Sequence, residues 1–591
     1  MFDISSVITI TGNAINNAIE RVVPSTSPPS TIILFDIILL IIIATIFAFI
    51  ARALKQPLIP AYILTGIIIG PMLGLIRDIT IITTLSEIGI AFLLFFAGLE
   101  ISMRRLRDVG KVSIFGGTIQ IFLIFAVSFW IAMLFGIFTR IEALYIGVAI
   151  AFSSTMIVIK LLTDKRELDT LHGHIVVGIL LVQDFFAIVA LMILAQGSFT
   201  LSVLAATFLK GALFILIAIL LSKTILKTLF RFAARNAELL LVSAITLCFI
   251  FVLIAYALDF SIIIGAFVAG LCLANSPFKT EIEGRIRPLR DFFSIIFFVS
   301  LGMQLLFSGL NKFVAPFFVF LVIAIILKPL IIMFLVSVFG YKKRTSFLTG
   351  LSLAQLSEFS LIILATGFLL GHLSQGLFSI IVLVTIITMT LTTYLIEYNR
   401  GIYRNFVYPT HFLEHLPEQK EKQELEYETR KKKKIILFGC HRMGTIFLRA
   451  FEKEKDNLLA VDMNPNIIKS LMKQKISCIY GDMTNPELLE KIRWKDAELV
   501  VSTIPEKEDN IFLIKHVKRI NPDTMVFVEA EHVHEALELY KEGADYVIVP
   551  QVVGGEKGLV LLRELTKKKE RLFKTREEHK KHLQKLHKFL G

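Results

Sequence analysis

The chain contains few cysteines and few charged residues. Only four of its 591 residues are cysteines, and no two of them form a Cys-X-X-Cys pair. The sequence therefore indicates neither a zinc site nor a disulfide framework. Charged residues account for 19% of the chain, whereas a soluble globular protein carries about 25%. This deficit predicts a membrane protein.

Apolar and basic residues are abundant. Hydrophobic residues make up 55% of the chain, Phe alone occurs 50 times, and the formal net charge is +13. Transporters carry excess Lys and Arg on their cytoplasmic loops, so this charge needs no nucleic-acid partner and none is expected. The N-terminus lacks the basic start and the small-residue cleavage site of a signal peptide.

Composition divides the chain into five segments. We expect an N-terminal extension (1–30), a transmembrane transport domain (31–400), a charged linker (401–433), a nucleotide-binding α/β domain (434–560) and a basic helical tail (561–591). The predicted fold is a polytopic α-helical membrane protein followed by a Rossmann-like domain, in which short strand-like runs alternate with helical ones.

The transmembrane domain contains thirteen apolar runs, each near the roughly 20 residues that a helix needs to cross hydrocarbon. Their approximate limits are 31–50, 58–75, 85–99, 112–136, 142–163, 172–194, 200–222, 236–256, 260–275, 292–306, 314–339, 347–370 and 373–395. The connections and span ends after odd-numbered runs carry 20 basic residues, and those after even-numbered runs carry three. The positive-inside rule then predicts a multi-pass inner-membrane protein with its N-terminus outside and its C-terminal domain in the cytoplasm.

Three ionisable residues fall near the middle of apolar runs: Asp184, Lys328 and Glu358. A charge at the centre of a membrane helix costs about 2.5–3.5 kcal/mol on insertion scales and is a functional candidate by default. Asp184 and Lys328 could also neutralise each other as a packing ion pair. Because removal from water favours the protonated form of a carboxylate, an acid here can bind H⁺ and a metal cation in turn. Gln183 offers a neutral amide oxygen, either to an alkali cation or to a neighbouring helix.

Two apolar runs are interrupted by polar clusters at mid-membrane. One contains Ser153-Ser154-Thr155, and the other contains Gln355 and Ser357-Glu358. The hydroxyls could bond back to their own helices. The clusters lie seven runs apart, however, so they have opposite orientations. An inverted-repeat transporter has two discontinuous helices of this kind, which meet beside the ion site. Ser153, Ser154 and Thr155 are therefore candidate cation ligands with Asp184.

A glycine-rich turn follows the first strand of the α/β domain. It runs from Gly439 through Cys440, His441, Arg442 and Met443 to Gly444, and Asp462 ends the next strand. Such a turn presents backbone N–H groups to a phosphate at a helix N-terminus, and the acid can hold ribose hydroxyls. His441 stands where a dinucleotide fingerprint has its middle glycine. This favours a regulatory nucleotide over a redox cofactor, and a Rossmann unit without any ligand is the alternative.

The membrane half resembles the monovalent cation:proton antiporter-2 family, and within it the Kef-type glutathione-gated potassium efflux systems. The residues that carry the resemblance include Pro60–Gly66, Phe96–Glu100, Gln183-Asp184, Phe297–Met303 and Ser357–Phe359. The family implies an inverted-repeat fold, a homodimer in lipid, an elevator-like core and Asp184 as the cation and proton site, with K⁺ or Na⁺ as its metal. The Gln183-Asp184 pair looks like that of the Kef branch, which favours K⁺; sodium-type relatives carry two adjacent acids.

The C-terminal half resembles the domain that regulates potassium conductance, called RCK or TrkA-N. Gly481-Asp482, Ser502–Pro505 and Gly543–Asp545 carry this resemblance. It implies regulation by AMP or NAD(H). The implied nucleotide-binding residues are Gly439, His441, Arg442, Met443, Gly444, Asp462, Asp482 and Thr503. We expect the basic tail in the place of the second RCK lobe.

Three functions are open on these observations. The first is a K⁺/H⁺ antiporter regulated by nucleotide, or a Na⁺/H⁺ antiporter of the same family. The second is an RCK-gated potassium channel, but the chain lacks a carbonyl-filter sequence such as Thr-Val-Gly-Tyr-Gly. The third is an oxidoreductase, but the chain lacks a substrate domain and a strict glycine fingerprint. We therefore expect a transporter that is not an enzyme.

Overall fold

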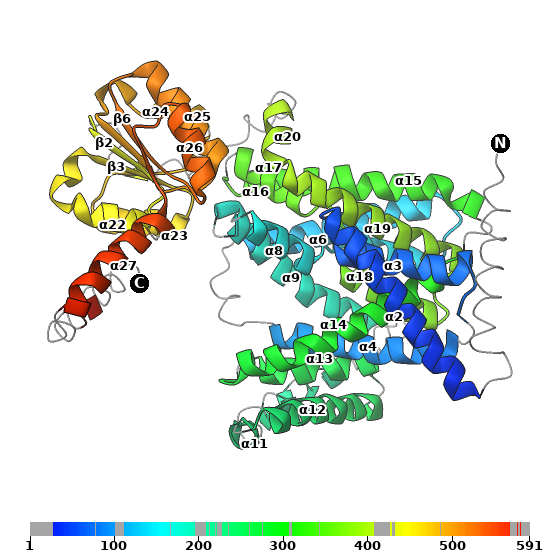
Figure 1. The fold of residues 1–591 in the computed structure, drawn as a ribbon. Helices are drawn as coiled ribbons and strands as arrows, with labels where there is room; N and C mark the ends of the chain where they lie inside the picture. The colour runs from blue at the N-terminus through cyan, green and yellow to red at the C-terminus, as the bar shows by residue number, and fades with distance from the viewer. Residues whose placement is uncertain are drawn as a thin grey trace. The chain divides into compact units, whose positions relative to one another are not determined.

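The computed structural model describes residues 28–567 and also 576, 579 and 580, except for 77–78, 101–111, 166, 169, 195–208, 212, 215, 219, 222–226, 235, 259, 275, 307–309, 342, 407–425, 428–431, 442 and 485. The chain folds into two compact units, formed essentially by the residues before and after Pro417 (Figure 1). The first unit is helical, and the second contains a β-sheet.

Among the described residues, eight helices of the first unit are long and apolar enough to cross a membrane, and four shorter apolar helices accompany them. The run at 292–306 forms the second half of one further helix, α14. The multi-pass prediction is therefore confirmed. The helices are α2 (Pro29–Ala53), α3 (Leu58–Ile67), α4 (Ile79–Glu100), α6 (Gly117–Leu134), α7 (Arg140–Ala151), α8 (Thr155–Asp164), α9 (Leu171–Leu194), α11 (Lys227–Ala233), α12 (Ala237–Ala257), α13 (Ile262–Leu273), α14 (Lys279–Met303), α15 (Val314–Val322), α16 (Lys328–Val338), α17 (Lys343–Ser352), α18 (Glu358–Leu369), α19 (Gln375–Glu397) and α20 (Asn399–Phe406).

Two of the predicted spans are broken, and each break lies at one of the two polar clusters from which it was predicted. The first span stops after α7 and resumes as α8, and the second stops after α17 and resumes as α18. The side chains of Ser154 and Ser357 cap the restarting helices by accepting hydrogen bonds from backbone N–H groups. A serine at this position satisfies a donor that the helix itself cannot. The same hydroxyls that interrupt the apolar runs therefore stabilise the new helix starts.

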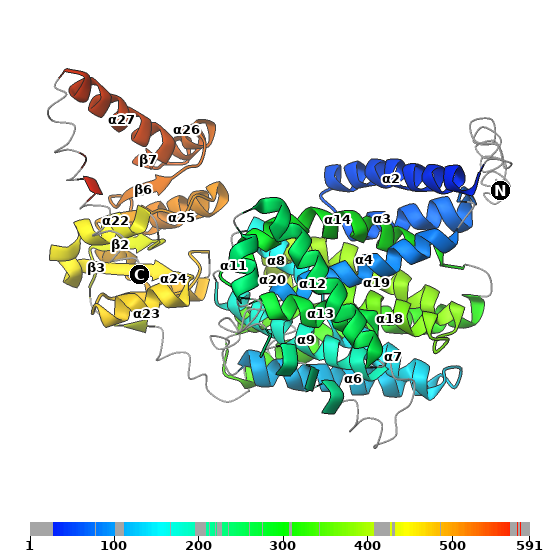
Figure 2. The ribbon, with the colours of Figure 1, turned by 90° about the horizontal axis from the view of Figure 1, so that it is seen from below.

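The helices of the first unit pack in two groups that the figures show side by side (Figures 1 and 2). In one group α4 contacts α13 and α14, and in the other α19 contacts α8, α17 and α18. Gly98 of α4 and Gly270 of α13 let their helices approach closely. A Cβ on Gly98 would lie 2.3 Å from the carbonyl oxygen of Phe267. Small residues allow such close backbone contact in membranes.

The second unit is a doubly wound α/β domain. Its strands β1 (Glu426–Tyr427), β2 (Ile435–Phe438), β3 (Leu458–Asp462), β4 (Cys478–Tyr480), β5 (Leu499–Ser502), β6 (Met525–Glu529) and β7 (Tyr546–Ile548) form one sheet in the order β1-β4-β3-β2-β5-β6-β7. All neighbours are parallel except the β1–β4 pair. The helices are α22 (Met443–Ala450), α23 (Pro465–Lys473), α24 (Pro486–Lys491), α25 (Lys507–Ile520), α26 (Val533–Lys541) and α27 (Pro550–Lys567).

Five of these strands match the strand-like runs that the sequence predicts at 434–438, 457–461, 498–502, 525–529 and 546–549, whereas β1 and β4 were not predicted. β4 is only three residues long and β1 only two, too short for a periodic pattern. β1 also lies in the predicted charged linker, which therefore contributes a strand to the sheet. The order of β4 to β7 is that of the Rossmann fold, in which ligands bind beyond the carboxyl ends of the strands.

Candidate functional site

The two broken spans of the first unit meet at a buried lysine. The ammonium of Lys328 donates hydrogen bonds to the carbonyl oxygens of Ile150 (3.1 Å), Phe152 (2.7 Å) and Gln355 (2.8 Å). These carbonyls lie at or just beyond the ends of α7 and α17. A helix that stops leaves unpaired carbonyls at the negative end of its dipole. Lys328, which is fully buried, supplies the missing donors.

Other hydrogen bonds hold the two breaks against each other. Ser153 donates its hydroxyl to the carbonyl oxygen of Leu353 (2.9 Å), and Gln355 donates its side-chain amide to that of Ser154 (3.2 Å). Ser360 donates to the carbonyl oxygen of Ala149 (2.7 Å). All of these side chains are fully buried. The crossing is therefore a polar joint within the apolar unit.

Asp184 lies in α9 beside the start of α8. The hydroxyl of Thr155 is 3.0 Å from both oxygens of the Asp184 carboxylate. Among the described residues it is the one hydrogen-bond donor to this carboxylate. The predicted neighbours Thr155 and Asp184 are thus brought together. The N-terminus of α8, the positive end of its dipole, also stabilises a negative charge here.

Gln183 points to the crossing instead. Its amide oxygen accepts the backbone N–H of Ser153 (2.8 Å), and its side chain is fully buried. This is the helix-bonding role that the sequence left open for it. Its use as a cation ligand stays a prediction.

Glu358 provides a second carboxylate. It is the first residue of α18, and its carboxylate accepts a hydrogen bond from the hydroxyl of Ser154. Ser154 thus connects α8 to the carboxylate of the other broken span. Both Glu358 and Asp184 border one cavity, together with Thr155.

This cavity has a volume of about 450 Å³. Its lining also includes Glu100, at the end of α4, and Arg290 of α14. The Arg290 guanidinium lies 4.0 Å above the ring of Phe96 and bonds the Asp291 carboxylate at 2.6 Å. Glu100 and Arg290 were not predicted as site residues. The position of Glu100, an acidic residue at the very end of an apolar span, is the sequence feature that could have indicated its role.

The alternative interpretation, an ion pair between Asp184 and Lys328, is not found among the described residues. Lys328 is occupied by three carbonyls, and Asp184 by Thr155. The sequence places both residues near the middle of their spans, and therefore at a similar depth in the membrane. A similar depth does not determine the direction in which each side chain points. Lys328 stabilises the crossing, and Asp184 faces the cavity.

The glycine loop of the second unit has the predicted position after β2. Gly439 has φ +77, a left-handed conformation that favours glycine. The Thr503 hydroxyl, just after β5, donates to the Gly439 carbonyl oxygen (2.9 Å). A Cβ on Gly444 would lie 2.0 Å from that same oxygen. Both glycines are therefore required by the shape of the loop.

Asp462 at the end of β3 holds this loop. Its carboxylate accepts backbone N–H groups from Cys440 (2.6 Å) and Asn464 (2.7 Å). Burial raises the pKa of the Asp462 carboxyl above its ordinary value, although both amide donors act to lower it. Asp482, after β4, accepts the backbone N–H and the hydroxyl of Thr484 at 2.9 Å.

The other predicted nucleotide residues lie nearby in the chain. His441 is exposed, Met443 opens α22, and Arg442 lies outside the described residues. Asp462 is the last residue of a parallel strand, and three other residues come after the carboxyl ends of such strands: Gly439, Asp482 and Thr503. This edge of the sheet is where ligands bind in the doubly wound fold.

Comparison with known proteins agrees with this geometry. A family model described as the transmembrane sodium/hydrogen exchanger matches residues 38–397, more than half of the chain. The chain belongs to the sodium/hydrogen exchanger family. A second model, the TrkA-N domain, matches residues 435–550 of this exchanger-family chain. The predicted resemblance is thereby confirmed for both halves.

Two relatives show how far the similarity extends. K(+) efflux antiporter 4 of Arabidopsis thaliana is 31% identical over 61% of this chain and 63% of its own length. Glutathione-regulated potassium-efflux system protein KefC of Shigella sonnei is 26% identical over 82% of this chain and 77% of its own. The chain thus spans just under two thirds of the Arabidopsis relative.

The fold of the exchanger-family unit is also seen in a solved structure. The sodium proton antiporter MjNhaP1 of Methanocaldococcus jannaschii has a TM-score of 0.50 and 18% identity, and the alignment covers 63% of this chain and 97% of that one. Similarity at this level concerns the fold alone. It confirms the predicted antiporter fold of the membrane unit.

Proposed function

We propose that this protein exchanges K⁺ for H⁺ across a membrane, and that Asp184 is the residue that binds both ions in turn. The observation that carries the proposal is the environment of Asp184. Its carboxylate faces a cavity, is bonded by the neutral hydroxyl of Thr155, and has no ion-pair partner among the described residues. A half-buried carboxylate in this state is stabilised by taking up a proton or a cation.

The cavity favours a cation over an anion. Four acidic side chains line it, from Asp184, Glu358, Glu100 and Glu283. Two basic side chains, Arg290 and Lys279, also line it, but both have acidic partners: Arg290 bonds Asp291, and Lys279 pairs with Glu283 at 3.4 Å. Carboxylate and hydroxyl oxygens are hard ligands that suit an alkali cation.

Exchange follows if one ion excludes the other. A proton on Asp184 removes the charge that attracts the cation, and a bound cation disfavours protonation. The joint at Lys328 connects both broken spans, so the site can move with the helices that bear it. Alternating exposure of a midplane site is how transporters with discontinuous helices operate.

K⁺ is the proposed cation, and Na⁺ is the alternative. The Arabidopsis relative is named a K(+) efflux antiporter, and KefC is named a potassium-efflux protein. The Gln183-Asp184 pair supports the same choice.

The second unit is proposed to bind AMP or NAD(H) and to regulate transport. Support comes from the preformed glycine loop, in which Asp462 and Thr503 fix the backbone around Gly439, and from the TrkA-N match. We also propose a homodimer in the inner membrane with the C-terminal unit in the cytoplasm. The asymmetry of basic residues supports this orientation.

The test uses purified protein in liposomes that contain a pH-sensitive dye. Adding K⁺ or Na⁺ outside should move protons in the wild type, whereas Asp184→Asn should reduce the rate at least about 100-fold, to the level of empty liposomes. Asp164→Asn, which removes an exposed carboxylate of α8, is the matched control and should transport normally.

Three results would reject parts of the proposal. Undiminished exchange by Asp184→Asn would reject the site. Exchange with Na⁺ but not K⁺ would reject the choice of cation. Currents at channel rates without a pH change would replace the antiporter with a gated pore.

A further inference from the structure

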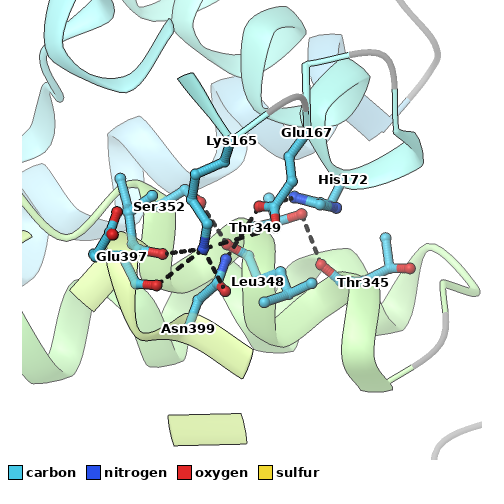
Figure 3. Close-up of polar contacts among 10 residues, drawn as sticks. Lys165, Glu167, His172, Thr345, Leu348, Thr349, Ser352, Glu397 and Asn399 are labelled. Carbon is cyan, nitrogen blue, oxygen red and sulfur yellow. Dashed lines mark hydrogen bonds and ion pairs between the residues drawn. The ribbon is translucent and has the colours of Figure 1, made fainter. Parts of the chain in front are cut away.

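A buried polar cluster joins the hairpin of α8 and α9 to the last helix of the membrane unit (Figure 3). It contains Lys165, Glu167, His172 and Asn399. The residues Glu167, His172 and Asn399 are buried, with 4%, 7% and 2% of their surface exposed. None of these four residues lines the cavity or contacts Asp184.

Lys165 is the cap residue of α8 and attaches it to the end of α19. Its ammonium donates to the carbonyl oxygens of Ile396 (2.7 Å) and Glu397 (3.1 Å), and to the side-chain oxygen of Asn399 (2.9 Å). A cation at a helix C-terminus is stabilised by the helix dipole. These hydrogen bonds therefore attach the C-terminal end of α8 to the junction between α19 and α20.

Glu167 completes the cluster from the α8–α9 turn. Its carboxylate lies 3.8 Å from the Lys165 ammonium, accepts the Asn399 side-chain amide at 3.1 Å, and lies 3.3 Å from the His172 imidazole. A Cβ on Gly173 would lie 2.3 Å from the Glu167 carbonyl oxygen, so the turn is tightly packed. Buried ion pairs contribute little net stability, and such a network needs another reason to persist.

The same short helix, α20, also contacts the other broken span. Ile402 and Tyr403 of α20 pack against Phe347 and Leu348 of α17, and the rings of Phe347 and Tyr403 are 5.4 Å apart. In Figure 3, Thr345, Leu348 and Thr349 of α17 lie beside the cluster. α20 therefore contacts both half-helices, α8 and α17, at the ends that lie away from the ion site.

These half-helices lead directly to the proposed ion site. α8 begins at Thr155, which bonds Asp184, and α9 contains both His172 and Asp184. α17 ends beside Leu353, whose carbonyl oxygen accepts from Ser153. In the other direction the chain continues from α20 toward the nucleotide-binding unit. A displacement of α20 would thus shift together the two helix ends beside the ion site, which are the N-terminus of α8 and the C-terminus of α17.

We propose that α20 is a coupling helix and that Lys165 and Asn399 are the positioning residues that transmit its position to the ion site. The inference rests on the proposed exchange function and adds a route for its regulation. Neither residue touches the cation. Without the Asn399 side chain, the protein should still bind nucleotide and still transport ions, but the nucleotide should no longer change the transport rate.

The first experiment measures K⁺-driven proton movement by the full chain in liposomes, with and without saturating AMP or NADH. In the wild type the nucleotide should change the rate several-fold. In Asn399→Ala and Lys165→Met the ratio of the two rates should fall to about one, while calorimetry shows unchanged nucleotide affinity. Lys165→Arg, which keeps the charge and donors, should retain most of the response. Lys160→Met removes an exposed lysine of the same helix and should respond as the wild type.

A second readout does not depend on transport. Hydrogen exchange in the Asn399→Ala protein should rise in peptides from α8 and α17 as well as in α20, whereas Lys160→Met should leave all three unchanged. Faster exchange in α20 alone would reduce the cluster to a local anchor and overturn the proposal. An undiminished nucleotide ratio in Asn399→Ala, or a wild type that no nucleotide affects, would also overturn it. A wild type without cation-driven proton movement would instead refute the proposed function, and the hydrogen-exchange result would still stand.

Discussion

The two units each place an aspartate close to the start of a helix or loop, and the two aspartates have different surroundings. Asp184 in the membrane unit is bonded by one hydroxyl and faces a cavity. Asp462 in the α/β unit accepts two backbone N–H groups, and both of its oxygens are used. The first carboxylate is left to bind an ion, and the second holds the shape of a loop.

The difference shows that burial does not by itself identify a functional charge. Lys328 is as buried as any residue in the chain, yet three carbonyls satisfy it and it joins two helices. The number of partners that the protein supplies separates structural from exchanging groups. Groups with full sets of partners should affect stability when removed, and Asp184 should affect transport.

The largest predicted effect on stability follows from removing Lys328. Lys328→Met leaves three buried carbonyls without their donor, at about 1–3 kcal/mol for each unsatisfied group. We expect the detergent-solubilised protein to lose about 3 kcal/mol or more and to unfold at a clearly lower temperature by circular dichroism. Lys160→Met is the control, because this lysine is exposed. A melting temperature equal to that of the control would show that the crossing does not depend on the ammonium.

An intermediate effect is expected from Gly439→Ala in the α/β unit. The added Cβ would lie 2.7 Å from the Thr503 hydroxyl, at a residue with φ +77. Strained backbone of this kind costs about 1–3 kcal/mol. If relaxation of the loop carries that cost into binding, the affinity for AMP or NADH falls about tenfold or more.

Isothermal titration with both nucleotides measures this change. Gly558→Ala is the matched control, since a Cβ there meets nothing within 4 Å. Transport without nucleotide should be the same in both variants. Equal affinities would mean that the nucleotide does not use the Gly439 loop.

The sequence predicted the positions of these sites better than their partners. Hydroxyls within apolar runs correctly located both helix breaks, and the strand–glycine–helix order located the loop. The partners of Lys328 could not be predicted, because Ile150 and Phe152 lie 178 and 176 residues away in the chain. Which of two mid-membrane charges faces a cavity depends on helix rotation and packing. Gln183 illustrates this, since its neighbour Asp184 faces the cavity while Gln183 faces Ser153.

The smallest predicted effect concerns a partly buried histidine in the α/β unit. Burial lowers the pKa of His516 below its ordinary value, and nearby Arg519 acts in the same direction. The imidazole packs against the rings of Trp494 and Phe512. The folded state therefore prefers neutral His516, and its contribution to stability is present above the unfolded-state pKa of about 6.5.

That contribution is lost as the pH falls through this value, because the unfolded chain then binds the proton more tightly. Hydrogen exchange of peptides from α25, corrected for intrinsic rates, should show less protection at pH 5.5 than at pH 7.5. In His516→Gln this difference should shrink, because glutamine does not titrate. Solvent screening at a partly exposed site keeps the effect small, in contrast to the buried charges of the membrane unit. If the difference in protection between the two pH values is just as large in His516→Gln, another group causes it. Removal of Lys328 would then be the remaining test of how burial of a charged group affects stability.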